Sequence, residues 1–120
     1  SQRDQLWEWR IRARQIGVDV SRKGVKDENI LPLLHRLPSP TLFTSDAHFY
    51  VPSLCRPRYC LMFLAVEDDE TALYVRLVLK HHAFKTNRKR LATVSRVTNK
   101  GITTWHLNSS TPIHYLWRQK

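Results

Sequence analysis

Four acidic residues stand where small α/β proteins carry their chemistry. Asp4, Asp27, Glu28 and Asp46 each fall near an expected helix start or strand end. A carboxylate at such an edge can hold a hard divalent ion, which polarises a phosphodiester and activates a water molecule. The four acids are therefore the candidate catalytic set, with Asp46, Asp27 and Glu28 as candidate metal ligands. The alternative is local, because Asp46 can cap the turn that follows it and the other two can cap a helix start.

The net positive charge of the chain is confined to its C-terminal part. All ten acidic residues precede Thr71, whereas the last fifty residues hold ten Lys and Arg, and the net charge is +10. A block of one sign is typical of a surface that faces a polyanion, most often nucleic acid and less often an acidic protein. The alternative is a set of solvated cations without a partner. The candidate phosphate contacts are Lys85, Arg88, Lys89, Arg90, Arg96 and Lys100.

Aromatic residues are the second component expected of a protein surface that binds nucleic acid. The candidates to stack on bases are Tyr50, Trp105, Tyr115 and Trp117. Aromatic side chains at strand spacing are also typical of a buried core, so both interpretations stay open for these four.

Length and composition indicate one soluble domain. The 120 residues are 42% hydrophobic, with only three Gly and six Pro, which favours a packed core over a low-complexity chain. No apolar run approaches the ~20 residues that span a bilayer, so we expect a cytoplasmic protein without a membrane partner. Cys55 and Cys60 lack a second cysteine pair and are expected to be reduced structural thiols.

Periodicity in the first half alternates between helix and strand. An amphipathic helix is expected over residues 6–16, closed by Gly17, followed by a short strand at 18–20. Asp27 or Asn29 can cap a second helix that ends before Pro38. Residues 41–44 then form a strand, and a loop or short helical stretch runs to Pro57.

The second half predicts a buried centre and an antiparallel edge. Residues 59–66 are apolar throughout, as in a central strand buried on both faces. The acidic run 67–70 is interpreted as the start of a third helix, rather than as a metal cluster, and that helix ends near Lys80. A basic turn or short helix follows at 85–90, then two antiparallel strands near 93–97 and 102–107. The fold class is therefore α/β, with a mainly parallel central sheet, helices on its faces and an antiparallel C-terminal edge.

Three short motifs in this order resemble those of PIN-like domains of the DUF5615 and Mut7-C type. They are Gly17-Val18-Asp19-Val20, Lys26-Asp27-Glu28-Asn29-Ile30-Leu31 and Pro40-Thr41-Leu42-Phe43-Thr44-Ser45-Asp46-Ala47-His48-Phe49. The resemblance covers most of the chain and implies a three-layer fold. It also implies a Mg²⁺- or Mn²⁺-dependent ribonuclease, the activity that such domains have as toxins of toxin–antitoxin pairs. In that resemblance Asp46 matches a metal-site aspartate, and Asp27 or Glu28 matches the acid carried by a helix.

Two departures from that pattern leave alternatives open. His48 stands where the resemblance places a second aspartate, and the strand that would bear the leading aspartate would precede Ser1, so Asp4 is the residue that could substitute for it. One alternative is a degenerate module that binds nucleic acid or regulates without cleaving it. Another is an interaction domain whose basic face docks an acidic, antitoxin-like protein. A homodimer is compatible with each of these functions.

Overall fold

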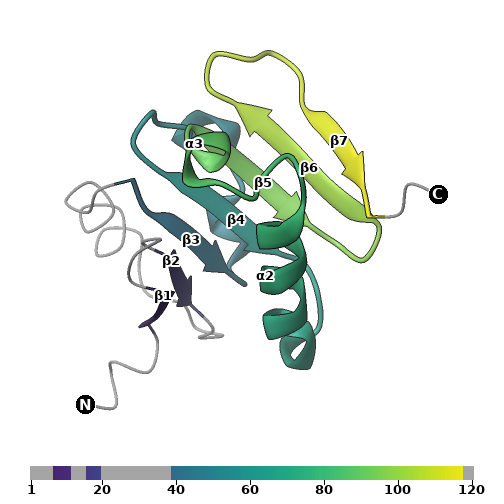
Figure 1. Cartoon of the computed structure of the whole chain (residues 1–120). Coiled ribbons are helices and arrows are strands. Elements are labelled where there is room, and N and C mark those ends of the chain that lie inside the picture. The colour runs from purple at the N-terminus through teal and green to yellow at the C-terminus, as the bar shows by residue number, and fades with distance from the viewer. Residues whose placement is uncertain (1–6, 12–15, 20–38, 118–120) are drawn as a thin grey trace.

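A seven-stranded mixed sheet forms the centre of the protein (Figure 1). The structure, a computed structural model, describes residues 7–11, 16–19 and 39–117. The strands lie side by side in chain order. They are β1 (Trp7–Ile11), β2 (Ile16–Asp19), β3 (Thr41–Thr44), β4 (Cys60–Leu64), β5 (Thr93–Val97), β6 (Gly101–His106) and β7 (Ile113–Leu116).

The centre of the sheet is parallel and its two edges are antiparallel. β2, β3, β4 and β5 pair in parallel, whereas β1 and the pair β6 and β7 run antiparallel to their neighbours. β4 lies in the middle with β3 beside it, which confirms the central strand predicted from the apolar run at 59–66. The α/β class with a parallel centre and an antiparallel C-terminal edge is therefore observed.

Two helices lie on the same side of the sheet, in front of it in Figure 1. α2 (Thr71–Lys80) packs Tyr74, Val75 and Val78 into one core cluster with buried residues of β2, β3 and β4. The short α3 (Asn87–Arg90) is tied to the same side by a hydrogen bond from Arg90 to β3. The turn η5 (Asp68–Glu70) precedes α2, and the side chains of Glu67 and Glu70 form a capping box there. The acidic run is thus a helix start, as predicted.

The opposite side of the sheet is covered in part by two short turns. These are η3 (Ala47–Phe49) and η4 (Pro52–Leu54), both in the connection between β3 and β4. Phe49, Cys55 and Tyr59 from this connection pack on Leu42 and Leu61 in a second core cluster. A second helical layer stays a prediction, because the helix expected between Asp27 and Pro38 lies outside the described residues.

The helix predicted over residues 6–16 is wrong. Trp7–Ile11 is a strand, and Ile16 begins a second strand that pairs with it antiparallel. The reason lies in a competing pattern, because the large apolar residues of WEWRI alternate with Glu and Arg at the period of a strand. β7 is a strand that the sequence did not predict.

Candidate nucleic-acid interface

Strand register brings five side chains into one row across the sheet. Residues that are direct partners on neighbouring strands project from the same face. This row, called the cross-strand row below, consists of Thr44, Phe63, Arg96, Thr103 and His114 on β3 to β7. Val94 and Trp105 stand two residues from members of the row and belong to the core cluster opposite α2. The row therefore lies on the sheet face that α2 does not cover.

The row becomes more exposed toward the C-terminal edge of the sheet. Thr44 is buried, Phe63 and Thr103 are half-buried, and Arg96 and His114 are exposed. The Thr103 hydroxyl lies 3.0 Å from Nδ1 of His114, so the two residues share a hydrogen bond that orients the imidazole. An exposed guanidinium, a hydroxyl and an imidazole together offer donors to a phosphate.

Two half-buried aromatic rings, of Tyr50 and Trp105, border the row beside the half-buried ring of its member Phe63. The ring of Tyr50 stacks on Phe63 at a centroid distance of 6.4 Å and an angle of 29°. Nε1 of Trp105 donates to the hydroxyl of Tyr50 at 3.1 Å, which joins the third ring to this pair. Because Phe63 is the direct β-partner of Arg96, partly exposed π-surface and positive charge occur side by side.

The other two predicted stacking residues lie on the helix side of the sheet. Tyr115 contacts Phe84 at a ring distance of 5.5 Å, and Trp117 contacts Tyr74 of α2 at 5.9 Å. Both pack against the core cluster that contains α2. The core interpretation therefore holds in part for all four rings, because Tyr50 and Trp105 likewise pack, half-buried, against the second core cluster, on the sheet face opposite α2.

The prediction that Arg90 contacts phosphate is wrong in this structure. The residue is fully buried. Its Nε donates to Oγ1 of Thr41 at 2.9 Å, and its Nη1 donates to the carbonyl oxygen of Phe84 at 2.8 Å. The guanidinium is held by core hydrogen bonds, so it acts as a structural link between α3 and β3.

The remaining five cations are exposed but do not form one stripe. Lys85, Arg88 and Lys89 lie in and before α3 on the helix side, where Nζ of Lys89 donates to the carbonyl of His82 at 2.8 Å. Arg96 projects from the opposite face, and Lys100 occupies the turn between β5 and β6. Five of the six candidate phosphate contacts are therefore exposed, and the sheet separates them into two groups.

Asp46 follows the carboxyl end of β3, where its side chain is 20% exposed. Its backbone N–H donates to Oγ1 of Thr44 at 3.0 Å. Its Oδ1 accepts from the backbone N–H of His48 at 2.9 Å and lies 3.0 Å from Nδ1 of that residue. Asp46 is thus the N-cap of η3, as the local interpretation proposed. Oδ2 accepts no hydrogen bond from the described residues, so this cap leaves one carboxylate oxygen for a ligand.

Asp19 is an acidic residue at the same sheet edge; it belongs to the motif Gly17-Val18-Asp19-Val20 but was not among the candidate site residues. It ends β2, and its β-partner on β3 is Thr44. The backbone therefore places an acidic position one strand away from the row, near the segment that bears Asp46. Its position at the end of a short alternating segment was the available signal, because carboxyl ends of parallel strands line the ligand-binding edge of open sheets.

The described residues do not form the predicted metal site, and they do not exclude it. Across residues 7–11, 16–19 and 39–117, no three His, Cys, Asp or Glu side chains gather as they would around an ion. Asp4, Asp27 and Glu28 lie outside those ranges, so their distance from Asp46 stays a prediction.

Both cysteines are buried free thiols, as predicted. Burial raises the pKa of the Cys60 thiol to about 11, partly offset by its hydrogen bond to Thr93 and by the charge of Arg90. Burial also raises the pKa of Cys55. Neither thiol is thus poised as a nucleophile or a metal ligand at neutral pH.

No helix in the described part of the chain is long and apolar enough to cross a membrane. Comparisons of the chain with protein-family models, with curated proteins and with solved structures return no match. The functional argument therefore depends on the geometry of the cross-strand row and of the sheet edge beside it.

Proposed function

We propose that this protein binds single-stranded RNA on the sheet face opposite α2. The observation that carries the proposal is the cross-strand row, in which exposed Arg96 and His114 adjoin the half-buried ring of Phe63. Single strands are commonly held by stacking of their bases on aromatic side chains while cations track the phosphates. Tyr50 and Trp105 extend the aromatic surface beside the row.

The charge of the C-terminal strands favours a polyanion as the ligand. No Asp or Glu occurs from Thr71 to the C-terminus, so β5, β6 and β7 carry no carboxylate that would repel a phosphate backbone. Lys100 adds a further exposed cation at the turn between β5 and β6. RNA rather than DNA is proposed because of the resemblance to PIN-like domains.

Metal-dependent hydrolysis of the bound strand is a second candidate function. The observation in its favour is Asp46, whose carboxylate is partly exposed at the carboxyl end of β3, the strand on which the row begins. In this proposal the chain has the three-layer PIN-like fold, and Asp27, Glu28 and Asp4 complete an acidic set around Mg²⁺ or Mn²⁺. The ion would activate water, and Asp46 would help to hold it. A toxin paired with an acidic antitoxin is the biological setting that fits this candidate.

The RNA-binding proposal is tested by a matched pair of arginine variants. Arg96→Ala removes an exposed cation from the row, whereas Arg76→Ala removes an exposed cation from α2 on the other side. We expect Arg96→Ala to weaken binding of a fluorescent single-stranded RNA about tenfold and to lower the salt slope by about 0.7, the value for one phosphate contact on a single strand. Arg76→Ala should leave the slope unchanged. Equal losses in both variants would mean non-specific attraction and would contradict the proposed face.

A further inference from the structure

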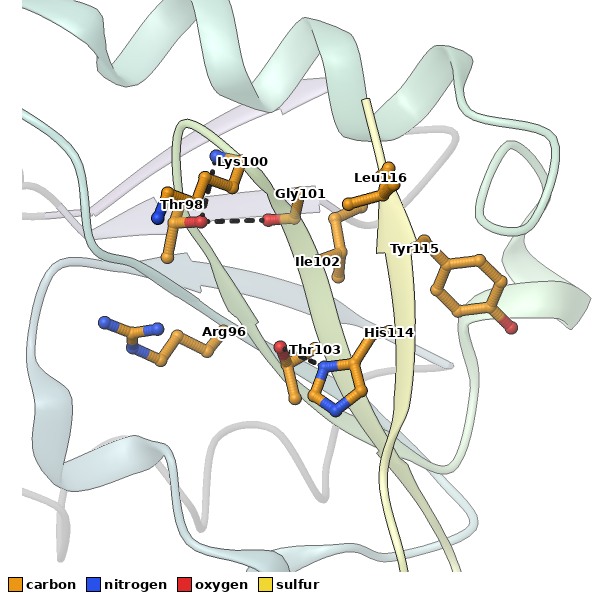
Figure 2. A pocket seen from close by; sticks show the side chains of 9 residues that line it. All are labelled: Arg96, Thr98, Lys100, Gly101, Ile102, Thr103, His114, Tyr115 and Leu116. Atoms are coloured by element: carbon orange, nitrogen blue, oxygen red, sulfur yellow. Dashed lines mark hydrogen bonds between the residues drawn. The ribbon is translucent and has the colours of Figure 1, made fainter. Parts of the chain in front are cut away.

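A hollow of about 240 Å³ adjoins the cross-strand row at the C-terminal edge of the sheet. It lies between the β5–β6 turn and β7, as Figure 2 shows. Ordinary pockets for organic ligands measure roughly 300–1,000 Å³, so this hollow suits a group the size of a single base rather than a larger ligand.

Gly101 lines the hollow at a point where β6 and β7 approach each other closely. Along β6, Gly101, Thr103 and Trp105 are alternate residues, and Gly101 is the direct partner of Leu116 on β7. A side chain at position 101 would collide with the backbone carbonyl oxygen of Tyr115, so the close approach of β7 requires glycine. Gly101 therefore lines the hollow with its backbone alone.

The two walls of the hollow differ in chemistry. Arg96 and Lys100 contribute positive charge from β5 and the turn, whereas His114 and Leu116 contribute an imidazole and an apolar side chain from β7. Leu116 is 61% exposed, which makes it the most exposed of the large hydrophobic side chains in the described ranges. In Figure 2 the His114 ring lies beside Thr103, while Arg96 extends from β5 on the other side of Thr103. None of the lining residues is acidic.

We propose that this hollow holds one nucleotide of the bound strand. The base lies against His114 and Leu116, and its phosphate faces Arg96 and Lys100. A phosphate alone would make no use of the exposed side chain of Leu116, because an anion gains nothing from an apolar surface. A base stacked on an imidazole beside that side chain uses it, and such stacking is sequence-tolerant. This inference deepens the proposed RNA binding and rests on it.

A matched pair of variants on β7 tests the hollow. Leu116→Asp places a negative charge at its wall, and Ile113→Asp makes the same change at a 44% exposed position whose partner, Thr104, projects from the helix side. We expect Leu116→Asp to weaken binding of single-stranded RNA at least tenfold and Ile113→Asp to change it less than twofold. His114→Ala, which removes the ring, should weaken binding as well and replaces Leu116→Asp if that variant fails to fold.

Titration with small probes decides which part of the nucleotide the hollow holds. Uridine 5′-monophosphate should shift the backbone amide resonances of Gly101, Thr103 and Leu116 of the full chain, and inorganic phosphate at the same concentration should not. Equal shifts with inorganic phosphate would overturn the base-binding role. If RNA binding requires Arg96 but neither aspartate variant of β7 changes the affinity, the hollow does not hold a nucleotide. The proposed function would remain in that case. Absence of RNA binding in the unmodified chain would overturn both.

Discussion

Arg90 donates a hydrogen bond from Nε to Oγ1 of Thr41 at 2.9 Å, and so joins α3 to β3 inside the core. The two residues are 49 positions apart in the chain, and neither is exposed to solvent. A residue inside a run of basic side chains, Arg88-Lys89-Arg90, is thus part of the core, while its neighbours Arg88 and Lys89 are exposed.

Removal of the Arg90 side chain should destabilise the fold strongly. Arg90→Ala leaves the Thr41 hydroxyl and the Phe84 carbonyl without this donor and opens a large cavity, for which we expect a loss of about 3 kcal/mol or more in the free energy of unfolding. Arg88→Ala, an exposed change in the same helix, should cost less than about 0.5 kcal/mol. Urea denaturation measures both values. Equal stability of the two variants would contradict the buried role of Arg90.

The aromatic ring of Phe63 should contribute to RNA affinity beyond its packing. Phe63→Leu keeps an apolar side chain on β4 but removes the π-surface, so we expect a loss of about 1–3 kcal/mol in binding free energy, the usual effect of one base–aromatic stack. Trp117→Leu, on the helix side, serves as the control and should leave affinity unchanged. Fluorescence anisotropy with a labelled single strand measures both. A larger loss for Trp117→Leu than for Phe63→Leu would indicate that RNA binds on the helix side of the sheet, and would contradict the proposed face.

Asp46→Asn separates the capping role of Asp46 from metal binding. Asn caps a helix start about as well as Asp, so the variant should fold with nearly unchanged stability. Loss of the negative charge should nevertheless reduce Mn²⁺-dependent cleavage of single-stranded RNA by orders of magnitude, while RNA affinity holds or rises slightly. Single-turnover cleavage assays give the rate. An unmodified chain that binds RNA without cleaving it in Mg²⁺ or Mn²⁺ would remove the hydrolytic candidate and leave the binding function.

The buried thiol of Cys60 should make stability fall at alkaline pH. Below its ordinary pKa of 9.0 the thiol is protonated in both the folded and the unfolded chain. Its contribution to the free energy of unfolding is therefore fully present at these pH values. Between pH 9 and about 11 the unfolded thiol loses its proton while the folded one retains it, which lowers the free energy of unfolding by up to about 1.4 kcal/mol per pH unit. Cys60→Ala should flatten this dependence in urea denaturation measured from pH 8 to 11. A variant with the same slope as the unmodified chain would show that other groups cause it.

Much of the C-terminal two-thirds of the fold could be predicted from local patterns. The strands near Thr41–Thr44 and Cys60–Leu64 and the helix Thr71–Lys80 follow from apolar runs, turn residues and helix-end charges, which act over a few residues. The N-terminal helix was wrong because its apolar residues fit both a helical and a strand period, and pairing with a neighbouring strand decides between them. β7 was not predicted because it has little of the alternation between buried and exposed residues that marks a strand. Of its four residues only Tyr115 is half-buried, and the others are exposed.

The candidate interface was harder to predict because it depends on register. Composition showed that cations dominate the last fifty residues, but it contains no information on which face of a sheet each one takes. Arg96 and Phe63 become neighbours only when β4 and β5 pair with a particular alignment, 33 positions apart in the chain. A shift of one residue would send each side chain to the opposite face.

The order of the strands determines at which point of synthesis the proposed RNA-binding surface is complete. Each strand pairs only with strands adjacent to it in the chain, so the sheet can grow by one strand at a time as the polypeptide leaves the ribosome. Of the described strands, β7 is made last, and it brings both His114 and Leu116. A nascent chain that has completed β6 would therefore present Arg96 and Phe63 without the wall of the hollow, and the proposed binding surface would be complete only once β7 has paired.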